Sequence, residues 1–161
     1  MASSVPAELL KQLSVASEAL NNVSDTFNQQ IDVIEEALAS YNLGVTAWVT
    51  AHSENDYDYD DGGQPIERFT RDINVGYQKN RGKWCLMAAL SISEFQIWEE
   101  WPLRDAPRER RLQAIDGIPR LLEKLISEAN TLAEQISKKT VEARVLATSI
   151  KPRKEQRNAK N

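Results

Sequence analysis

Two reactive side chains, His52 and Cys85, are each the only one of their type in this sequence of 161 residues. A cysteine thiolate acts as a nucleophile when a neighbouring base takes its proton, and histidine is the usual base. Alternating polarity places both residues on the outer face of predicted strands, which permits them to lie close together. No oxyanion loop, Gly-Ser-x-Gly element or orienting acid accompanies them. We therefore interpret His52 as a surface residue and Cys85 as a packing residue, and predict no enzymatic activity.

An acidic segment has the spacing of a calcium loop, in which carboxylates supply hard oxygen ligands. Carboxylates occupy positions 1, 3, 5 and 12 of that spacing: Asp56, Asp58, Asp60 and Glu67. Position 6, where glycine makes the sharp turn, is Asp61. The flanking segments are predicted strands rather than the helices of such a loop. We expect a solvated acidic loop that attracts a basic partner, with no metal ion and no cofactor; a bound cation is the alternative.

Arginines crowd the predicted start of the last helix: Arg104, Arg108, Arg110 and Arg111. Free backbone N–H groups at a helix N-terminus favour anions, and guanidinium groups bind carboxylates or phosphates with paired hydrogen bonds. Asp105 and Glu109 lie between them at spacings that allow local ion pairs. No glycine-rich phosphate loop is present. We expect a solvated, ion-paired face; the alternative is a site for a nucleotide-like anion held by Arg108 and Arg111.

Three tryptophans are candidates for contacts with a partner. Trp48 shares its predicted strand face with His52, and a large aromatic on a polar face is either covered by a loop or an anchor for a partner. Trp98 and Trp101 fall in the expected connection between the sheet and the last helix. We expect this pair to plug the end of the core, although tryptophan is also enriched at binding hot spots. In the anion-binding alternative, Trp48 or Trp98 supplies an aromatic surface.

The elements that must position these residues begin and end with helices. In block 6–41, apolar residues recur every 3.6 residues on average, which predicts a helix with one apolar stripe. The polar stretch 21–25 predicts a kink or break in it, because short polar side chains compete for backbone hydrogen bonds. Block 104–149 shows the same period. Its segment Asp116-Gly117-Ile118-Pro119 predicts a kink near 116–119, because proline removes a backbone hydrogen bond.

The middle block, 43–93, changes to a period of two, which predicts three half-buried strands. The first strand contains Val45, Ala47 and Val49, and the third runs from Trp84 to Ile92. Residues 79–83 include a glycine and predict a tight hairpin between the second and third strands. The acidic segment between the first two strands is expected to be a long, mobile connection.

These elements predict an α+β fold in which two long antiparallel helices pack on a three-stranded antiparallel meander. We expect a single domain over 1–150 and a flexible basic tail over 151–161. If the end of the first helix lies beside the start of the last one, the final turns of the last helix overhang. Val141, Val145 and Ile150 would then lack an intrachain partner, which favours a second chain as their cover.

Composition and charge restrict the classes of function. Hydrophobic residues make up 41% and charged residues 27%, and no apolar run approaches the roughly 20 residues of a membrane span. A single cysteine excludes an internal disulfide. The first thirty residues contain one cation, Lys11, which is unlike a signal or transit peptide and predicts a cytoplasmic protein. Residues 151–161 carry five cations and one acid while the other 150 residues sum to −8, so nucleic acid is expected to bind at most through the tail.

The sequence therefore predicts a non-catalytic, cytoplasmic protein-interaction module. We expect it to form a homo-oligomer through its long helices and to present the outer sheet face or the acidic loop to a protein partner. The alternative is a protein that binds or sequesters a small anionic ligand.

Overall fold

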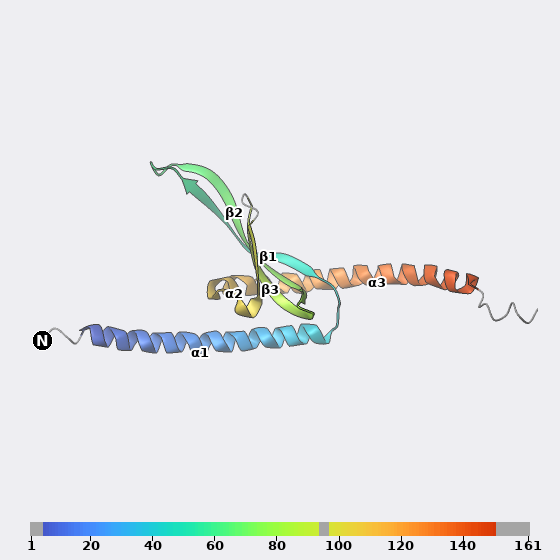
Figure 1. Cartoon of the computed structure of the whole chain (residues 1–161), viewed down its shortest axis with the longest axis horizontal. Coiled ribbons are helices and arrows are strands. Elements are labelled where there is room, and N and C mark those ends of the chain that lie inside the picture. The colour runs from blue at the N-terminus through green and yellow to red at the C-terminus, as the bar shows by residue number, and fades with distance from the viewer. Residues whose placement is uncertain (1–4, 94–96, 151–161) are drawn as a thin grey trace, which may run out of the picture.

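The computed structural model describes residues 5–93 and 97–150, in which two long helices extend from an antiparallel sheet (Figure 1). The predicted basic tail, 151–161, lies outside the described residues. The elements in chain order are α1 (Val5–Ser40), β1 (Ala47–Tyr59), β2 (Pro65–Asn80), β3 (Lys83–Ile92), β4 (Ile97–Pro102), a 3-10 turn η1 (Leu103–Asp105), α2 (Arg108–Ile115) and α3 (Ile118–Ser149). The expected α+β class and antiparallel pairing are confirmed.

The sheet has four strands in the order β1-β2-β3-β4, so the prediction of three strands was wrong. The additional strand, β4, is the segment expected to connect the sheet with the last helix. Its pairing runs from Ile92 with Ile97 to Met87 with Pro102. Two consecutive glutamates, Glu99 and Glu100, interrupt the alternation of polarity that normally identifies a strand. The backbone of β3 supplies the pairing that the side-chain pattern does not indicate.

The acidic segment is also part of the sheet rather than a long mobile connection. β1 and β2 pair as far as Tyr59 and Pro65, and they form a curved two-stranded arm that extends away from the helices (Figure 1). The connection closes through Asp60, whose Oδ1 accepts hydrogen bonds from the backbone N–H groups of Gly62 at 2.9 Å and Gln64 at 2.7 Å. Backbone pairing thus extends the strands well beyond the apolar core.

The hairpin predicted at residues 79–83 is confirmed. Only Arg81 and Gly82 lie between β2 and β3, and both have positive φ, at 48° and 86°. Two successive positive φ angles are typical of the type I′ turn, whose twist matches that of the paired strands. This turn fixes the register of β2 on β3 from Asn80 with Lys83 onward.

The core lies between one face of the sheet and the helices. Ile73, Val75 and Leu86 from the sheet are buried against Leu121 and Leu125 of α3. Ile31 and Leu38 of α1 and Leu103 of η1 belong to the same cluster. The expected kink near 116–119 is a break between α2 and α3. Gly117 lies at this break because a Cβ there would be only 2.7 Å from Val75 Cγ1.

The arrangement of the long helices differs from the prediction in two ways. First, α1 is a single helix of 36 residues without a break at 21–25. Second, α1 and α3 point in the same direction rather than antiparallel, and they extend toward opposite ends of the molecule (Figure 1). The apolar stripes do not need to cover each other, because α1 packs on β3 and η1 while α3 packs on β1 and β2.

Candidate interaction surfaces

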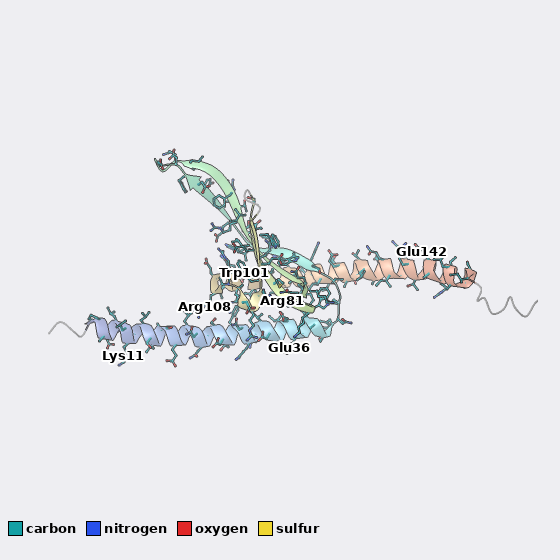
Figure 2. All side chains as sticks on the ribbon, in the orientation of Figure 1. Lys11, Glu36, Arg81, Trp101, Arg108 and Glu142 are labelled. Atoms are coloured by element: carbon teal, nitrogen blue, oxygen red, sulfur yellow. The ribbon has the colours of Figure 1, made fainter. Side chains whose placement is uncertain are left out.

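The outer half of each long helix projects beyond the sheet. Every described side chain from residue 6 to 23 in α1, and from residue 133 to the end of α3 and Ile150 directly after it, is exposed. Figure 2 labels one residue on each half, Lys11 and Glu142, at opposite ends of the molecule. Each half contains 18 residues and is about 27 Å long at 1.5 Å per residue. In proteins most helical stability comes from packing of an apolar face rather than from helix propensity, so a covering surface would stabilise both halves.

The projecting half of α1 carries an apolar stripe. Leu9, Leu13 and Leu20 recur at helical spacing and continue the line of Phe27 and Ile31, which face the core. Leu13 is 65% exposed. The stripe predicted from the sequence is therefore present, but its first half has no cover within the described chain.

The projecting half of α3 is apolar on two sides. Ile136 and Ile150 continue the line of Leu125, which faces the core. Ile136 is 57% exposed. Val141 and Val145 are exposed as predicted, but their spacing places them on the opposite side of the helix from Ile136. The described chain covers neither side, so the overhang is longer than the sequence predicted.

The two helices differ in charge. Residues 5–40, which form α1, contain six acids and one lysine, a net charge of −5. Residues 118–161, which comprise α3 and the chain that follows it, contain ten basic and five acidic residues, a net charge of +5. Most of this charge lies outside the projecting halves, because residues 6–23 carry two acids and one lysine (−1) and residues 133–150 carry three basic and two acidic residues (+1).

The arginine cluster attaches α1 to η1 and α2. Arg104 forms an ion pair with Asp32 at 2.9 Å, and Arg108 donates to Asn21 Oδ1 at 2.6 Å. Arg111 donates through Nη1 to Asn28 and through Nη2 to Ser24 Oγ, the latter at 3.2 Å. These contacts bind short polar side chains that would otherwise compete for the backbone of α1, which explains why the helix does not break there.

Arg111 is buried, and no acid among the described residues forms an ion pair with it. It is 6% exposed, and it donates to the neutral oxygens of Asn28 and Ser24. Its Nε has no hydrogen-bond partner in the described part of the chain. A hollow of about 180 Å³ lies beside it, lined by Leu20, Val23, Ser24, Phe27, Arg108, Arg111 and Leu112. The aromatic ring at these arginines is therefore Phe27, not Trp48 or Trp98 as the anion-binding alternative expected.

The outer sheet face carries a pair of tryptophans. Trp48 lies flat over Gly76, where a Cβ would be only 2.2 Å from its ring. Trp98 meets Trp48 edge-on, with ring centroids 5.6 Å apart, and is 49% exposed. Trp48 Nε1 donates to Gln78 Oε1 at 3.3 Å. We expected both Trp98 and Trp101 to close the end of the core. Trp101 packs against the core, whereas Trp98 is not among the residues that do.

His52 and Cys85 are not brought together. A β-bulge between Thr50 and His52 shifts the register by one residue, so His52 pairs with Ile73 on the opposite face from Trp48. His52 Nε2 lies 2.7 Å from Glu54 Oε1. Cys85 pairs with Gln78 of β2. His52 lies level with Leu90 of β3, which is five residues, or about 16 Å along the strand, from Cys85. Burial raises the pKa of Cys85, and Glu35 adds to this effect, which disfavours the thiolate.

The calcium-loop spacing lies on the arm formed by β1 and β2. The side chains of Asp56 and Glu67 lie outside the described part of the structure. Asp60, the third of the four carboxylates, uses Oδ1 to close the turn at Gly62 and Gln64. Among the described side chains, no group of three or more histidines, cysteines or acids is arranged to hold a metal ion.

One important side chain, Glu35, was not identified from the sequence. Its Oε2 accepts a hydrogen bond from the backbone N–H of Leu86 at 2.8 Å, on β3 just beyond the last pair with β4. Burial raises the pKa of Glu35, and the charge of Asp32 raises it further. The only signal in the sequence is an acid beside the apolar stripe of α1.

Comparison with protein-family models, curated proteins and solved structures found no match for this chain. Within residues 5–93 and 97–150, no helix is both long enough and apolar enough to cross a membrane.

Proposed function

We propose that this chain is a non-catalytic interaction module that associates with copies of itself through the projecting halves of α1 and α3. The observation that carries the proposal is the exposed apolar stripe on each half. Covering a leucine or isoleucine fully contributes about 1.5–3 kcal/mol. Several such residues recur on each half, so pairing would stabilise two helix segments that the chain itself leaves in water.

The charges of the projecting halves permit a second copy as the partner. Residues 6–23 carry a net charge of −1 and residues 133–150 a net charge of +1, so no strong like-charge repulsion opposes contact between an α1 half and an α3 half. The cytoplasmic location and the absence of catalysis expected from the sequence belong to the same proposal. The outer sheet face and the acidic arm remain available for a different protein.

Sedimentation velocity over a range of concentrations tests this function. We expect the average mass of the wild type to rise with concentration. A double variant, Leu13→Glu with Ile136→Glu, should remain a monomer because each change places a charge in a stripe. The matched control is Ser14→Glu with Gln135→Glu, which adds the same charges away from the stripes and from Val141 and Val145, and should still associate. A wild type that stays monomeric at high concentration contradicts the proposal.

A second candidate function, supported by the burial of Arg111, is binding of a small anion with an apolar part. An unpaired buried cation is unfavourable, and a carboxylate in the hollow would compensate its charge. At about 180 Å³ the hollow is smaller than typical ligand pockets of roughly 300–1,000 Å³. An engineered cavity of about 150 Å³ holds benzene, so a carboxylate with about six carbons fits better than a nucleotide.

Thermal unfolding with hexanoate tests this candidate, with 1-hexanol as the uncharged control. We expect hexanoate to raise the melting temperature, and hexanol to raise it less. A concentration of one hundred times Kd stabilises by about 2.7 kcal/mol. Arg108→Met and Arg111→Met should each reduce the effect of hexanoate. Equal effects of hexanoate and hexanol, or no effect of either, would exclude an anion site.

A further inference from the structure

A second hollow, of about 410 Å³, lies at the end of the sheet. It is lined by residues of the β2–β3 hairpin, β3, the end of β4 and η1: Asn80, Arg81, Met87, Glu100, Pro102 and Asp105. Figure 2 labels Arg81. The hollow shares no lining residue with the hollow at Arg111, and its volume is within the roughly 300–1,000 Å³ of typical ligand pockets. We propose that it binds a basic amino acid such as lysine, independently of the proposed self-association.

The hollow presents charges of both signs that do not neutralise each other. Arg81 supplies a guanidinium group, and Glu100 and Asp105 supply two carboxylates. Among the described residues, no ion pair joins the guanidinium to either acid. The two acids would repel a ligand that is only anionic, and Arg81 would repel a ligand that is only cationic. A ligand that carries both signs can pair with all three groups.

The balance of these charges selects the class of amino acid. One guanidinium and two carboxylates give the lining a net charge of −1. A basic amino acid has a net charge of +1, with one carboxylate and two cationic groups. Its α-carboxylate pairs with Arg81, and its α-ammonium and side-chain cation pair with Glu100 and Asp105. A neutral amino acid would leave one of the two acids without a partner.

The carboxylate of Glu100 is oriented by two donors on the outer sheet face. Its Oε2 accepts a hydrogen bond from Gln78 Nε2 at 3.1 Å, and its Oε1 accepts one from Trp98 Nε1. A carboxylate has about four lone-pair positions, so these bonds leave room for a ligand ammonium. Because the acceptor is already held in place, less conformational entropy is lost on binding.

The bottom of the hollow is apolar. Met87 is only 3% exposed, and it pairs with Pro102 across β3 and β4. Asn80 Nδ2 lies 3.7 Å from Met87 Sδ and donates to it. The methylene groups of a lysine side chain can cover apolar surface of this kind while the charged end reaches a carboxylate.

The backbone at Arg81 provides a variant that spares the fold. Arg81 has a φ of 48° and occupies the first position of the hairpin turn, where asparagine is a preferred residue. An arginine in this left-handed conformation is strained, and such strain is found at ligand sites. Arg81→Asn removes the guanidinium and suits the turn, so a loss of binding in this variant cannot come from a broken hairpin.

Isothermal titration calorimetry of the full chain with L-lysine at low salt tests the proposal. We expect saturable binding of one lysine per chain. Norleucine lacks the side-chain ammonium and cadaverine lacks the carboxylate, so each should bind at least about tenfold more weakly, because a charge-assisted hydrogen bond is lost. Arg81→Asn, Glu100→Gln and Asp105→Asn should each weaken lysine binding by a similar factor.

Two control variants change the same charges outside the hollow. Lys83→Gln removes a cation beside the same hairpin turn, and Glu99→Gln removes an acid from the same strand as Glu100. Both should bind lysine as the wild type does, and circular dichroism should show the same fold in all variants. A wild type that binds no lysine at millimolar concentrations overturns the proposal. Equal affinity for lysine and norleucine, or lysine binding that survives all three lining substitutions, overturns it as well.

Discussion

Replacing Glu35 tests how α1 is attached to the edge of β3. Leu86 is fully buried, and its N–H points to the side of β3 where β4 has already ended, so the Glu35 carboxylate is its acceptor. Glu35→Ala leaves this buried donor unpaired, which we expect to lower the free energy of unfolding by about 1–3 kcal/mol. Glu35→Gln keeps an acceptor oxygen at the same position and serves as the matched control, with a smaller loss.

The titration of Glu35 makes the free energy of unfolding depend on pH. Burial, followed by the charge of Asp32, raises its pKa above the ordinary value of 4.5, against the opposing effects of the Leu86 hydrogen bond and Arg104. The folded chain therefore binds this proton more tightly than the unfolded chain. The contribution of the protonated group to stability is complete below pH 4.5 and is lost as pH rises through the raised pKa.

Two other titratable side chains face Glu35. Burial raises the pKa of Tyr77 above 10.0 and that of Cys85 above 9.0, with the charge of Glu35 contributing to both. Neither group changes its charge between pH 4 and pH 7, and comparison with Glu35→Gln, which retains Asp32 and Arg104, separates the contribution of the Glu35 carboxylate in this range. We therefore expect the stability of the wild type, relative to Glu35→Gln, to fall as pH rises through this range.

Urea unfolding followed by tryptophan fluorescence, at several pH values and one protein concentration, measures these effects. With an m-value of about 2 kcal/mol/M, a loss of about 2 kcal/mol lowers the midpoint by about 1 M. The alanine variant should show such a shift at pH 7. An alanine variant as stable as the wild type would refute the role of Glu35 at β3. A glutamine variant with an unchanged pH dependence would refute the titration.

Three further substitutions test close contacts. Gly76→Ala should destabilise the fold by about 1–3 kcal/mol and alter tryptophan fluorescence, because the new Cβ would lie 2.2 Å from the Trp48 ring; an unchanged spectrum and urea midpoint would contradict this. Gly117→Ala should lower the free energy of unfolding by a similar amount, and with it the melting temperature, because its Cβ would lie 2.7 Å from Val75 Cγ1. A higher melting temperature would disprove the contact. Arg111→Lys should cost about 1–3 kcal/mol in urea unfolding, because an ammonium cannot bind two partners as a guanidinium fork does; equal stability would show that the fork is dispensable.

Several elements follow from local sequence alone. The apolar spacing of 3.6 predicts both long helices, and the break at 116–119 follows from Gly117 and Pro119. The hairpin at Arg81 and Gly82 follows from turn chemistry. Val141 is exposed as expected, although the expectation came from an antiparallel pairing of the two helices that the structure does not have; it is exposed because α3 extends beyond the sheet. The helices, the break and the hairpin depend on residues close to one another in the chain.

Other elements depend on contacts that no local pattern contains. β4 and the arm beyond the core are strands because a neighbouring strand satisfies their backbone groups, although their side chains are acidic and irregular. The bulge before His52 moves this side chain to the other face, and a period-two pattern cannot show one inserted residue. The anion-binding alternative placed its arginines near Trp48 for the same reason: the sequence does not show which face each element presents.

The sequence by itself determined that two amphipathic helices flank an antiparallel sheet, because hydrophobic periodicity and turn residues act over a few positions. Only the tertiary structure decided that α1 continues unbroken through residues 21–25, since Arg108 and Arg111 bind its polar side chains from 80 or more residues away in the chain. It also decided that the helices point the same way and leave opposite ends uncovered. Direction depends on how the sheet and α2 separate the two helices, which is a long-range property of the packed chain.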